Sequence, residues 1–171
     1  MFFKNKYYDV LKIKEHQNQK EKILFEISKY NSSYNCPISK TDWDVINIID
    51  QNWFDFSFSE FDKQKFIQFV FKKYRKNPKL INSWFNQYNS NSGSHHKLHN
   101  HENSDIVGIY YVELTDKSLR TILVNPTNGK KIIPKIGEGD LLLFKSNIFH
   151  ESPKNFTDTR KTVIAFNFEL F

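Results

Sequence analysis

The spacing of apolar residues near the start of the chain predicts a short strand followed by a helix. Residues 7–14 mix apolar side chains and lysines in the pattern of a half-buried strand. From about residue 18 to residue 30, Ile23, Ile27 and Tyr30 recur at the spacing of one helix face. This helix therefore has an apolar side that needs a partner.

A second predicted helix is marked by its ends. Ser59 can cap its start, with Asp62 three residues later as the partner in a capping box. Phe66 and Val70 then lie on one face, and Pro78 stops the helix. Two helices alone would bury little apolar surface, so we expect both to pack against a sheet.

After residue 79 the pattern changes to short apolar segments separated by Gly, Asn and Pro. Short strands with regular turn signals and no helices between them are typical of a sandwich or barrel. The length suits a single domain over residues 1–171, mainly β (α+β) in class. Residues 1–79 would supply the N-terminal strand and two supporting helices, and residues 80–171 the β core. The expected strands in that core are 80–88, 105–114, 119–124, 131–134, 139–144 and 162–171.

Composition agrees with a folded domain in a reducing environment. Hydrophobic residues make up 39% of the chain and 17 residues are Phe, a good strand former. The single cysteine, Cys36, rules out an intramolecular disulfide. The apolar start is too short for a signal peptide, and no run approaches the roughly 20 apolar residues of a membrane helix. We expect a soluble, cytoplasmic protein that does not enter a membrane.

The net charge of +6 leaves two interpretations open. It could indicate an acidic partner or nucleic acid. The basic residues are spread along the chain, however, and the one compact cluster, residues 72–76, falls where a helix should end. Cations there complement the helix dipole without any ligand. A nucleic-acid partner is therefore the weaker alternative.

The histidines carry the most specific chemical signal. His99 and His101 are two apart, so in a strand both imidazoles would point to one face. His150 follows the apolar strand 139–144 and could add a third nitrogen from across a barrel. Three ligands on one side of an ion leave the opposite positions open, as non-heme Fe(II) oxygenases require. The alternative is a solvated histidine-rich turn.

The last predicted strand adds a candidate anion site. Arg160 and Thr162 share one face of it, so a guanidinium and a hydroxyl project together. Such a pair can hold one carboxylate of a dicarboxylate whose 2-oxo acid end chelates the metal. A plain salt bridge from Arg160 to an acidic neighbour is the alternative interpretation.

From about Trp84 to Phe171, the sequence resembles the Fe(II)/2-oxoglutarate-dependent oxygenases, especially the prolyl-4-hydroxylase-like branch. The resemblance rests on four elements in order: Tyr88 in its Gln-Tyr-Asn-Ser context, the His99-Asn100-His101 pair, the segment Gly108–Val112, and Pro134 to His150 with Arg160 beyond it. It implies a double-stranded β-helix, the jelly-roll or cupin-like barrel of that family.

The resemblance also implies ligands and cofactors. His99 and His150 match the family's first and last iron ligands, and Arg160 matches the residue that binds the far carboxylate of 2-oxoglutarate. Tyr111 matches a tyrosine that reaches the same carboxylate, and Tyr88 one beside the cosubstrate. The expected cofactors are Fe(II), 2-oxoglutarate and O2, with ascorbate as a candidate reductant.

One position departs from the family pattern. Most members carry Asp or Glu two residues after the first histidine, where this chain has His101. We therefore expect a three-histidine site of His99, His101 and His150. Neutral imidazoles leave the full charge on the metal, which should alter its affinity and potential.

Two other functions compete with the oxygenase. Gly93, the histidine pair and Asp105 partly match the ligand set of a cupin-type metal barrel that does not use 2-oxoglutarate. Such a barrel gives Arg160 no role. A non-catalytic barrel would bind a peptide, sugar or nucleic acid. For an oxygenase, a prolyl or other peptidyl residue is the leading substrate by resemblance, followed by a small metabolite and then a nucleobase. Nothing in the sequence indicates an oligomeric state.

Overall fold

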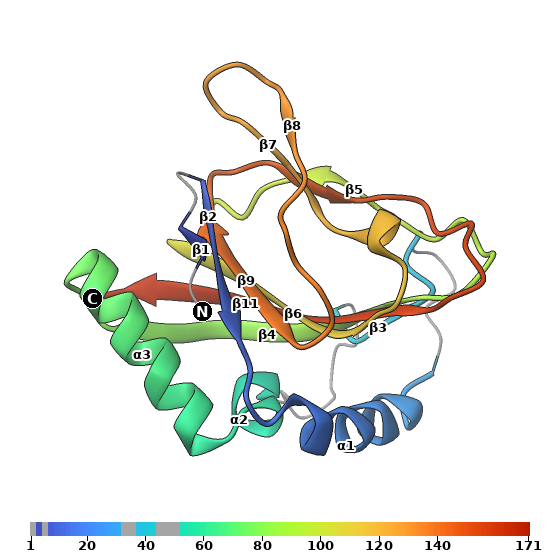
Figure 1. Ribbon diagram of the computed structural model, residues 1–171, viewed down its shortest axis with the longest axis horizontal. Helices are drawn as coiled ribbons and strands as arrows, with labels where there is room; N and C mark the ends of the chain where they lie inside the picture. Colours follow the sequence, from blue (N-terminus) through green and yellow to red (C-terminus); the bar gives the residue numbers. More distant parts are fainter. Residues whose placement is uncertain (1–2, 5–6, 32–36, 44–51) are drawn as a thin grey trace.

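The computed structural model describes residues 3–4, 7–31, 37–43 and 52–171, and Cys36 lies outside them (Figure 1). The helices are α1 (His16–Ser28), α2 (Trp53–Ser57) and α3 (Glu60–Tyr74), with a 3-10 turn η1 (Lys117–Leu119). The major sheet contains, in spatial order, β1 (Phe3–Lys4), β2 (Tyr8–Lys12), β9 (Asp140–Lys145), β6 (Ile106–Leu114), β11 (Lys161–Leu170), β4 (Pro78–Tyr88) and β3 (Lys40–Thr41). The minor sheet contains β5 (His96–His99), β10 (His150–Ser152), β7 (Ile122–Val124) and β8 (Lys131–Ile132).

The two sheets face each other, and the helices cover the outer face of the major sheet (Figure 1). Neighbouring strands in both sheets are antiparallel. This is a double-stranded β-helix, so the predicted fold class is confirmed. Among the described helices, none is long and apolar enough to cross a membrane.

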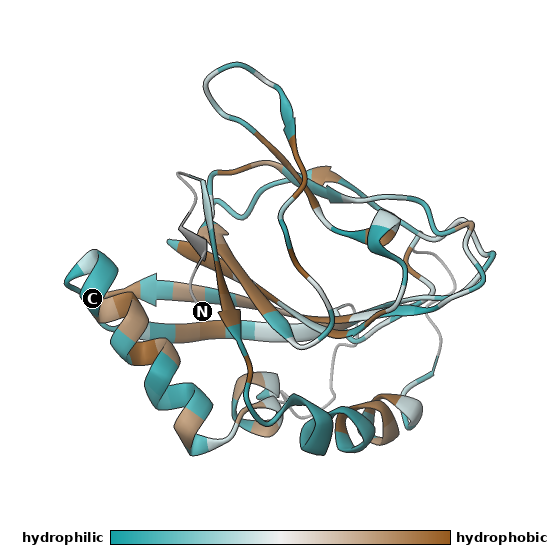
Figure 2. Ribbon diagram, in the orientation of Figure 1, coloured by the Kyte–Doolittle hydropathy of each residue, from teal (hydrophilic) through white to brown (hydrophobic). Residues whose placement is uncertain are grey.

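The major sheet is apolar on both faces, which produces two separate cores (Figure 2). On the helix side, Ile23 of α1 and Phe66 of α3 pack with Phe166 of β11. On the side facing the minor sheet, Val163 of β11 packs with Leu123 of β7. Ile164, next to Val163, belongs to the helix-side core, so adjacent residues of β11 serve different cores, as the two-residue period of a strand requires.

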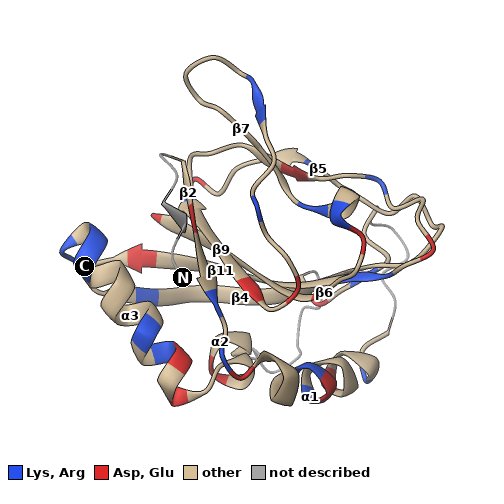
Figure 3. Ribbon diagram, viewed as in Figure 1, with Lys and Arg blue, Asp and Glu red and all other residues tan. Residues whose placement is uncertain are grey.

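The caps of α3 agree with the prediction from sequence. The Ser59 side chain accepts a hydrogen bond from the Asp62 backbone N–H, and Arg75 ends the helix in a left-handed conformation. Lys72 and Lys73 lie in the last turn, where they complement the helix dipole. Figure 3 shows both signs of charge along α1 and α3 and no continuous basic face on them.

Several elements differ from those predicted. The short helix α2 was not predicted, and neither were the two-residue strands β1 and β3. The strand expected over 119–124 begins only at Ile122, because residues 117–119 form η1 with Asp116 as its cap. The histidine-containing strands β5 and β10 are only four and three residues long, too short for a periodic signal.

Candidate metal centre and cosubstrate pocket

Three histidines meet between the sheets. His99 ends β5, and His150, which begins β10, is its cross-strand partner in the minor sheet. His101 follows β5 in a loop that is fixed by a hydrogen bond from its backbone N–H to the Ser146 carbonyl, 3.0 Å away. One ligand nitrogen from each histidine lies within 4.8 Å of the other two. The structure thus brings together the three histidines that the sequence singled out.

An irregularity in β5 adds a fourth histidine to the pocket. Between the cross-strand pairs His150–His99 and Ser152–His96, β5 has one more residue than β10, which is a β-bulge. In a regular strand, residues three apart face opposite sides, whereas here the rings of His96 and His99 stack 3.9 Å apart. The idea that His99 and His101 are alternate residues of one strand was wrong, because β5 ends at His99.

Backbone carbonyls fix the orientation of two of the imidazoles. Nδ1 of His99 lies 2.7 Å from the Lys97 carbonyl oxygen, and Nδ1 of His150 lies 3.2 Å from that of Ile148. A carbonyl only accepts, so Nδ1 carries the proton in both and Nε2 keeps its lone pair for a ligand. Hydrogen bonds of this kind orient metal-binding histidines.

Burial also keeps these histidines neutral, the form that binds metal ions. It is the main cause of the lowered pKa values of His99, His101 and His150, and for His101 the value falls to about 4. The neighbouring His99 lowers the pKa of His101 further. Three neutral, converging imidazoles with no carboxylate among the described ligands fit a divalent transition metal such as iron.

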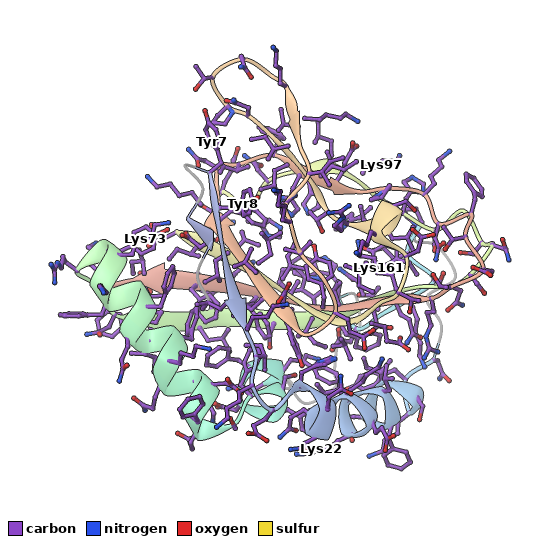
Figure 4. The ribbon with its side chains drawn as sticks, viewed as in Figure 1. Tyr7, Tyr8, Lys22, Lys73, Lys97 and Lys161 are labelled. Carbon is purple, nitrogen blue, oxygen red and sulfur yellow. The ribbon has the colours of Figure 1, made fainter. Side chains whose placement is uncertain are left out.

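The same pocket contains one buried cation, Lys161. Its side chain is 1% exposed, and Figure 4 shows it in the interior while Lys97 and Lys22 lie on the outside. Nζ donates to the Leu119 carbonyl, 2.7 Å away, and to Ser152 Oγ, 2.8 Å away. No carboxylate contacts it within the part of the chain that the structure describes.

The surroundings of Lys161 favour an anionic ligand. Desolvation lowers its pKa to about 7. The ammonium lies 5.0 Å from the ring centre of Tyr88 and 5.8 Å from that of Tyr111. A buried ammonium without a counter-charge is unfavourable. A carboxylate bound in this pocket would supply that counter-charge.

Arg160, the residue expected to hold such a carboxylate, lies outside the pocket. Its Nε and Nη2 each donate to a Glu113 carboxylate oxygen at 2.9 Å, and its side chain is 43% exposed. Thr162 also donates to Glu113 and accepts from Gln87 Nε2. Arg160 and Thr162 do share a face, as expected, but it is the face turned away from the histidines. A shift of one residue along a strand reverses the side, so Lys161 takes the inward position.

The two predicted tyrosines are both buried beside Lys161. Tyr88 lines the pocket with the histidines. The Tyr111 hydroxyl donates to Thr121 Oγ1, 2.6 Å away, and Thr121 also lines the pocket. Burial raises the pKa of Tyr111, so its phenol stays protonated.

A second, outer groove opens next to the histidines. It has a volume of about 390 Å³ and shares His96, His99 and His101 with the inner pocket. Trp84 also lines both spaces, and its ring stacks on His101 at 5.7 Å between centroids. A molecule in the groove would therefore lie beside the three-histidine centre.

Comparison of the sequence with protein-family models finds no match, and comparison with curated proteins finds none. Solved structures do match. The viral collagen prolyl hydroxylase of Paramecium bursaria Chlorella virus 1, in complex with 2-oxoglutarate, has a TM-score of 0.63 at 13% identity, covering 96% of each chain. A Pseudomonas putida prolyl-4-hydroxylase has a TM-score of 0.63 at 8% identity, covering 96% of this chain and 93% of its own.

HygX from Streptomyces hygroscopicus, with nickel and 2-oxoglutarate bound, has a TM-score of 0.64 at 10% identity, covering 95% of this chain and 82% of its own. At such low identities the likeness establishes the fold. The protein has the double-stranded β-helix fold of the Fe(II)/2-oxoglutarate oxygenases.

Proposed function

We propose that the protein is an Fe(II)- and 2-oxoglutarate-dependent dioxygenase that hydroxylates a C–H bond, with release of succinate and CO2. The observation that carries this proposal is that one pocket contains three converging neutral histidines and a buried lysine with no carboxylate partner among the described residues. A metal site alone would suit many proteins. A metal site combined with a buried cation suits a small acid that is held at both ends.

Each residue has a distinct part in this proposal. His99, His101 and His150 would hold Fe(II), which activates O2 when it is bound together with 2-oxoglutarate. Lys161 would hold the far carboxylate of 2-oxoglutarate by a charge-assisted hydrogen bond. The roles of Tyr88 and Tyr111 would be to line this end of the pocket and exclude water from it.

For the substrate, we propose a prolyl or other peptidyl residue. Two of the solved structures with this fold are prolyl hydroxylases by name. The outer groove beside the histidines offers Trp43 and Trp84, whose ring centroids lie 4.3 Å apart. Aromatic faces of this kind can contact a proline ring.

The test is an anaerobic titration of the purified protein with Fe(II) and then 2-oxoglutarate, monitored by the visible charge-transfer band of the chelate. We expect the band in the wild type and its loss in His150→Ala, because the metal loses a ligand. Lys161→Ala should bind iron but weaken 2-oxoglutarate at least 30-fold, since a buried charged pair loses about 2–5 kcal/mol when one partner is removed.

Arg160→Ala is the matched control, because it removes a cation one residue away that faces Glu113 instead of the pocket. It should leave 2-oxoglutarate affinity unchanged. The opposite result, with Arg160 essential and Lys161 dispensable, would contradict the assignment of Lys161. Iron binding without any response to 2-oxoglutarate would favour the cupin-type barrel, and binding of neither would favour a non-catalytic one.

A further inference from the structure

The outer groove lacks positive charge although the whole chain carries a net charge of +6. Of the lining residues that the structure describes, none is Lys or Arg, and Glu102 at the exposed rim is the acidic one. The polar groups are otherwise the pocket histidines, Thr41 and five asparagines. Phosphates and nucleic acids are bound mainly by cations, so this groove does not suit them. It suits an uncharged molecule that forms hydrogen bonds.

One asparagine in the groove has an unused buried acceptor. Asn167 of β11 is 7% exposed, and its Oδ1 has no hydrogen-bond partner within the described ranges 3–4, 7–31, 37–43 and 52–171. Buried polar atoms in native proteins are nearly always paired. Oδ1 itself is covered, so a turn of the amide about its Cβ–Cγ bond is needed to present it to the groove, where a ligand could supply the missing partner. That partner must be an N–H or O–H donor.

The other buried asparagine of the groove is already used within the protein. The Asn86 amide nitrogen donates to Thr41 Oγ1, 2.9 Å away, and its oxygen accepts from Trp84 Nε1, 3.2 Å away. These contacts fix the indole of Trp84. A group resting on Trp84 is then held beside His101, which stacks on the same ring.

The distance between Trp84 and Asn167 suits an extended peptide. Trp84 pairs across the sheet with Ala165, and Asn82 pairs with Asn167, so these are consecutive cross-strand pairs on one face. They are two residues apart along each strand, which is about 7 Å. In an extended peptide, main-chain N–H groups on one side also repeat every two residues, at about the same distance.

We infer that Asn167 accepts a hydrogen bond from a main-chain N–H of an uncharged, extended peptide, about two residues from the side chain that lies on Trp84. This rests on the proposed function, which places the reacting residue beside the three histidines. Asn167 would then fix how far the peptide slides along the groove. It is a positioning residue for the substrate and is not one of the three metal-binding residues.

The first experiment measures binding without turnover. Capped, uncharged octapeptides with one central proline are titrated into the anaerobic Fe(II)- and 2-oxoglutarate-loaded protein, and calorimetry gives the dissociation constant. We expect Asn167→Leu to weaken binding at least tenfold, with iron and 2-oxoglutarate binding unchanged. Its melting temperature should stay the same or rise, because an unpaired buried acceptor has been removed. Asn167→Ala, a smaller change, should weaken binding similarly.

Asn147→Leu is the control, since Asn147 is exposed on the loop after β9 and does not line the groove. It should bind the peptides like the wild type. A structural role for Asn167 predicts a different pattern, in which the melting temperature falls and binding does not change. That pattern, or equal binding by the wild type and all three variants, would overturn the inference.

The second experiment locates the donor. Each peptide N–H is replaced in turn by an ester oxygen, which removes the donor and keeps the chain. Replacement at one position should lower the affinity for the wild type at least tenfold and the affinity for Asn167→Leu only slightly, because the two changes remove the same hydrogen bond. If no peptide binds while a neutral oligosaccharide does, the peptide inference is wrong but the oxygenase proposal stands, since iron and 2-oxoglutarate binding are measured separately.

Discussion

Lys161 is a residue whose charge depends on what lies beside it. Its pKa of about 7 results from burial alone, and the titratable groups around it are Tyr88, Tyr111 and, further away, His96. Burial raises the pKa of Tyr111 and lowers that of His96, so both are neutral at pH 7. A bound carboxylate would favour the ammonium form and raise this pKa. Binding of the cosubstrate should therefore take up a proton whenever the free lysine is neutral.

We predict that 2-oxoglutarate affinity is nearly constant below pH 7 and falls above it, by up to about tenfold per pH unit. The sign follows from the pKa of about 7 in the free pocket and a higher value in the complex. Calorimetry at pH 8 in two buffers of different ionisation enthalpy should show uptake of close to one proton.

Lys161→Arg is the control for this prediction, because a guanidinium stays charged at all of these pH values. Its 2-oxoglutarate affinity should not vary with pH between 7 and 9. A wild-type profile as flat as that of the variant would mean that Lys161 remains charged in the free protein and that its burial is offset by another group.

At the scale of single elements, the start of α3 also organises the start of α1. The Asp62 carboxylate accepts hydrogen bonds from the backbone N–H groups of Lys14, at 3.0 Å, and Glu15, at 3.3 Å. Glu15 itself forms no side-chain cap on α1. A buried residue of one helix thus takes the place of a cap on another, which holds both helices against the sheet.

This arrangement predicts unequal effects of two substitutions in α3. Ser59→Ala removes an ordinary N-cap and should lower the free energy of unfolding by about 1 kcal/mol. Asp62→Ala leaves two backbone donors of the α1 segment without their acceptor and should cost about 2–4 kcal/mol. Urea unfolding at pH 7.5 measures both. Equal losses would show that water satisfies the Lys14 and Glu15 donors when Asp62 is absent.

Helices α1 and α3 and the central strands were predictable because each has a local signal. Ser59 and Pro78 mark the limits of α3, and the strands of the major sheet carry long apolar runs. The histidines were predictable from residue type and order. The inward residue of β11 was not, because both faces of that strand are buried. Val163 and Ile164 are equally apolar, so alternation could not show whether Arg160 or Lys161 faces the pocket.

His96 shows a second limit of the same kind. Its place in the pocket depends on one extra residue in β5 relative to β10, and a bulge is a property of the pairing of two strands. Neither four-residue β5 nor three-residue β10 contains a periodic pattern that could reveal it. The pairing could only be seen in the folded structure.

At the scale of the whole molecule, the major sheet separates the pocket from the helices. Adjacent residues of β6 show this division: Tyr111 lies beside Lys161, while Tyr110 faces α1. The Tyr110 hydroxyl lies 2.7 Å from Nδ1 of His16, the first residue of α1. Packing of the helix therefore acts on the strand that lines the pocket.

His16 is the centre of a buried polar network on the helix side. Its Nε2 lies 3.4 Å from a Glu138 oxygen that also accepts from Lys20 Nζ at 2.6 Å. The ring packs on Gly139, where a Cβ would come within 3.0 Å of it and where φ is +81°. The turn before β9 therefore requires glycine at this position.

We predict that this network loses stability in acid. Burial is the main cause of the lowered pKa of His16, and Glu138 only partly opposes it, so the folded protein favours the neutral ring. The unfolded chain takes up a proton near pH 6.5. The contribution of His16 to the free energy of unfolding is therefore complete above that pH. It declines as the pH falls toward the pKa of His16 in the folded protein, by at most about 1.4 kcal/mol per pH unit.

Urea unfolding of the metal-free protein at pH 7.5 and pH 5.5 tests this, with His16→Gln as the matched variant. Glutamine can still form hydrogen bonds but cannot be protonated, and both proteins keep the same pocket histidines, so their effects cancel in the comparison. The wild type should have the higher free energy of unfolding at pH 7.5, and the difference between the two proteins should be smaller at pH 5.5. An advantage that is unchanged or larger in acid would mean that His16 is held as the cation by Glu138, and the network would then be an ion pair that links α1 to the sheet.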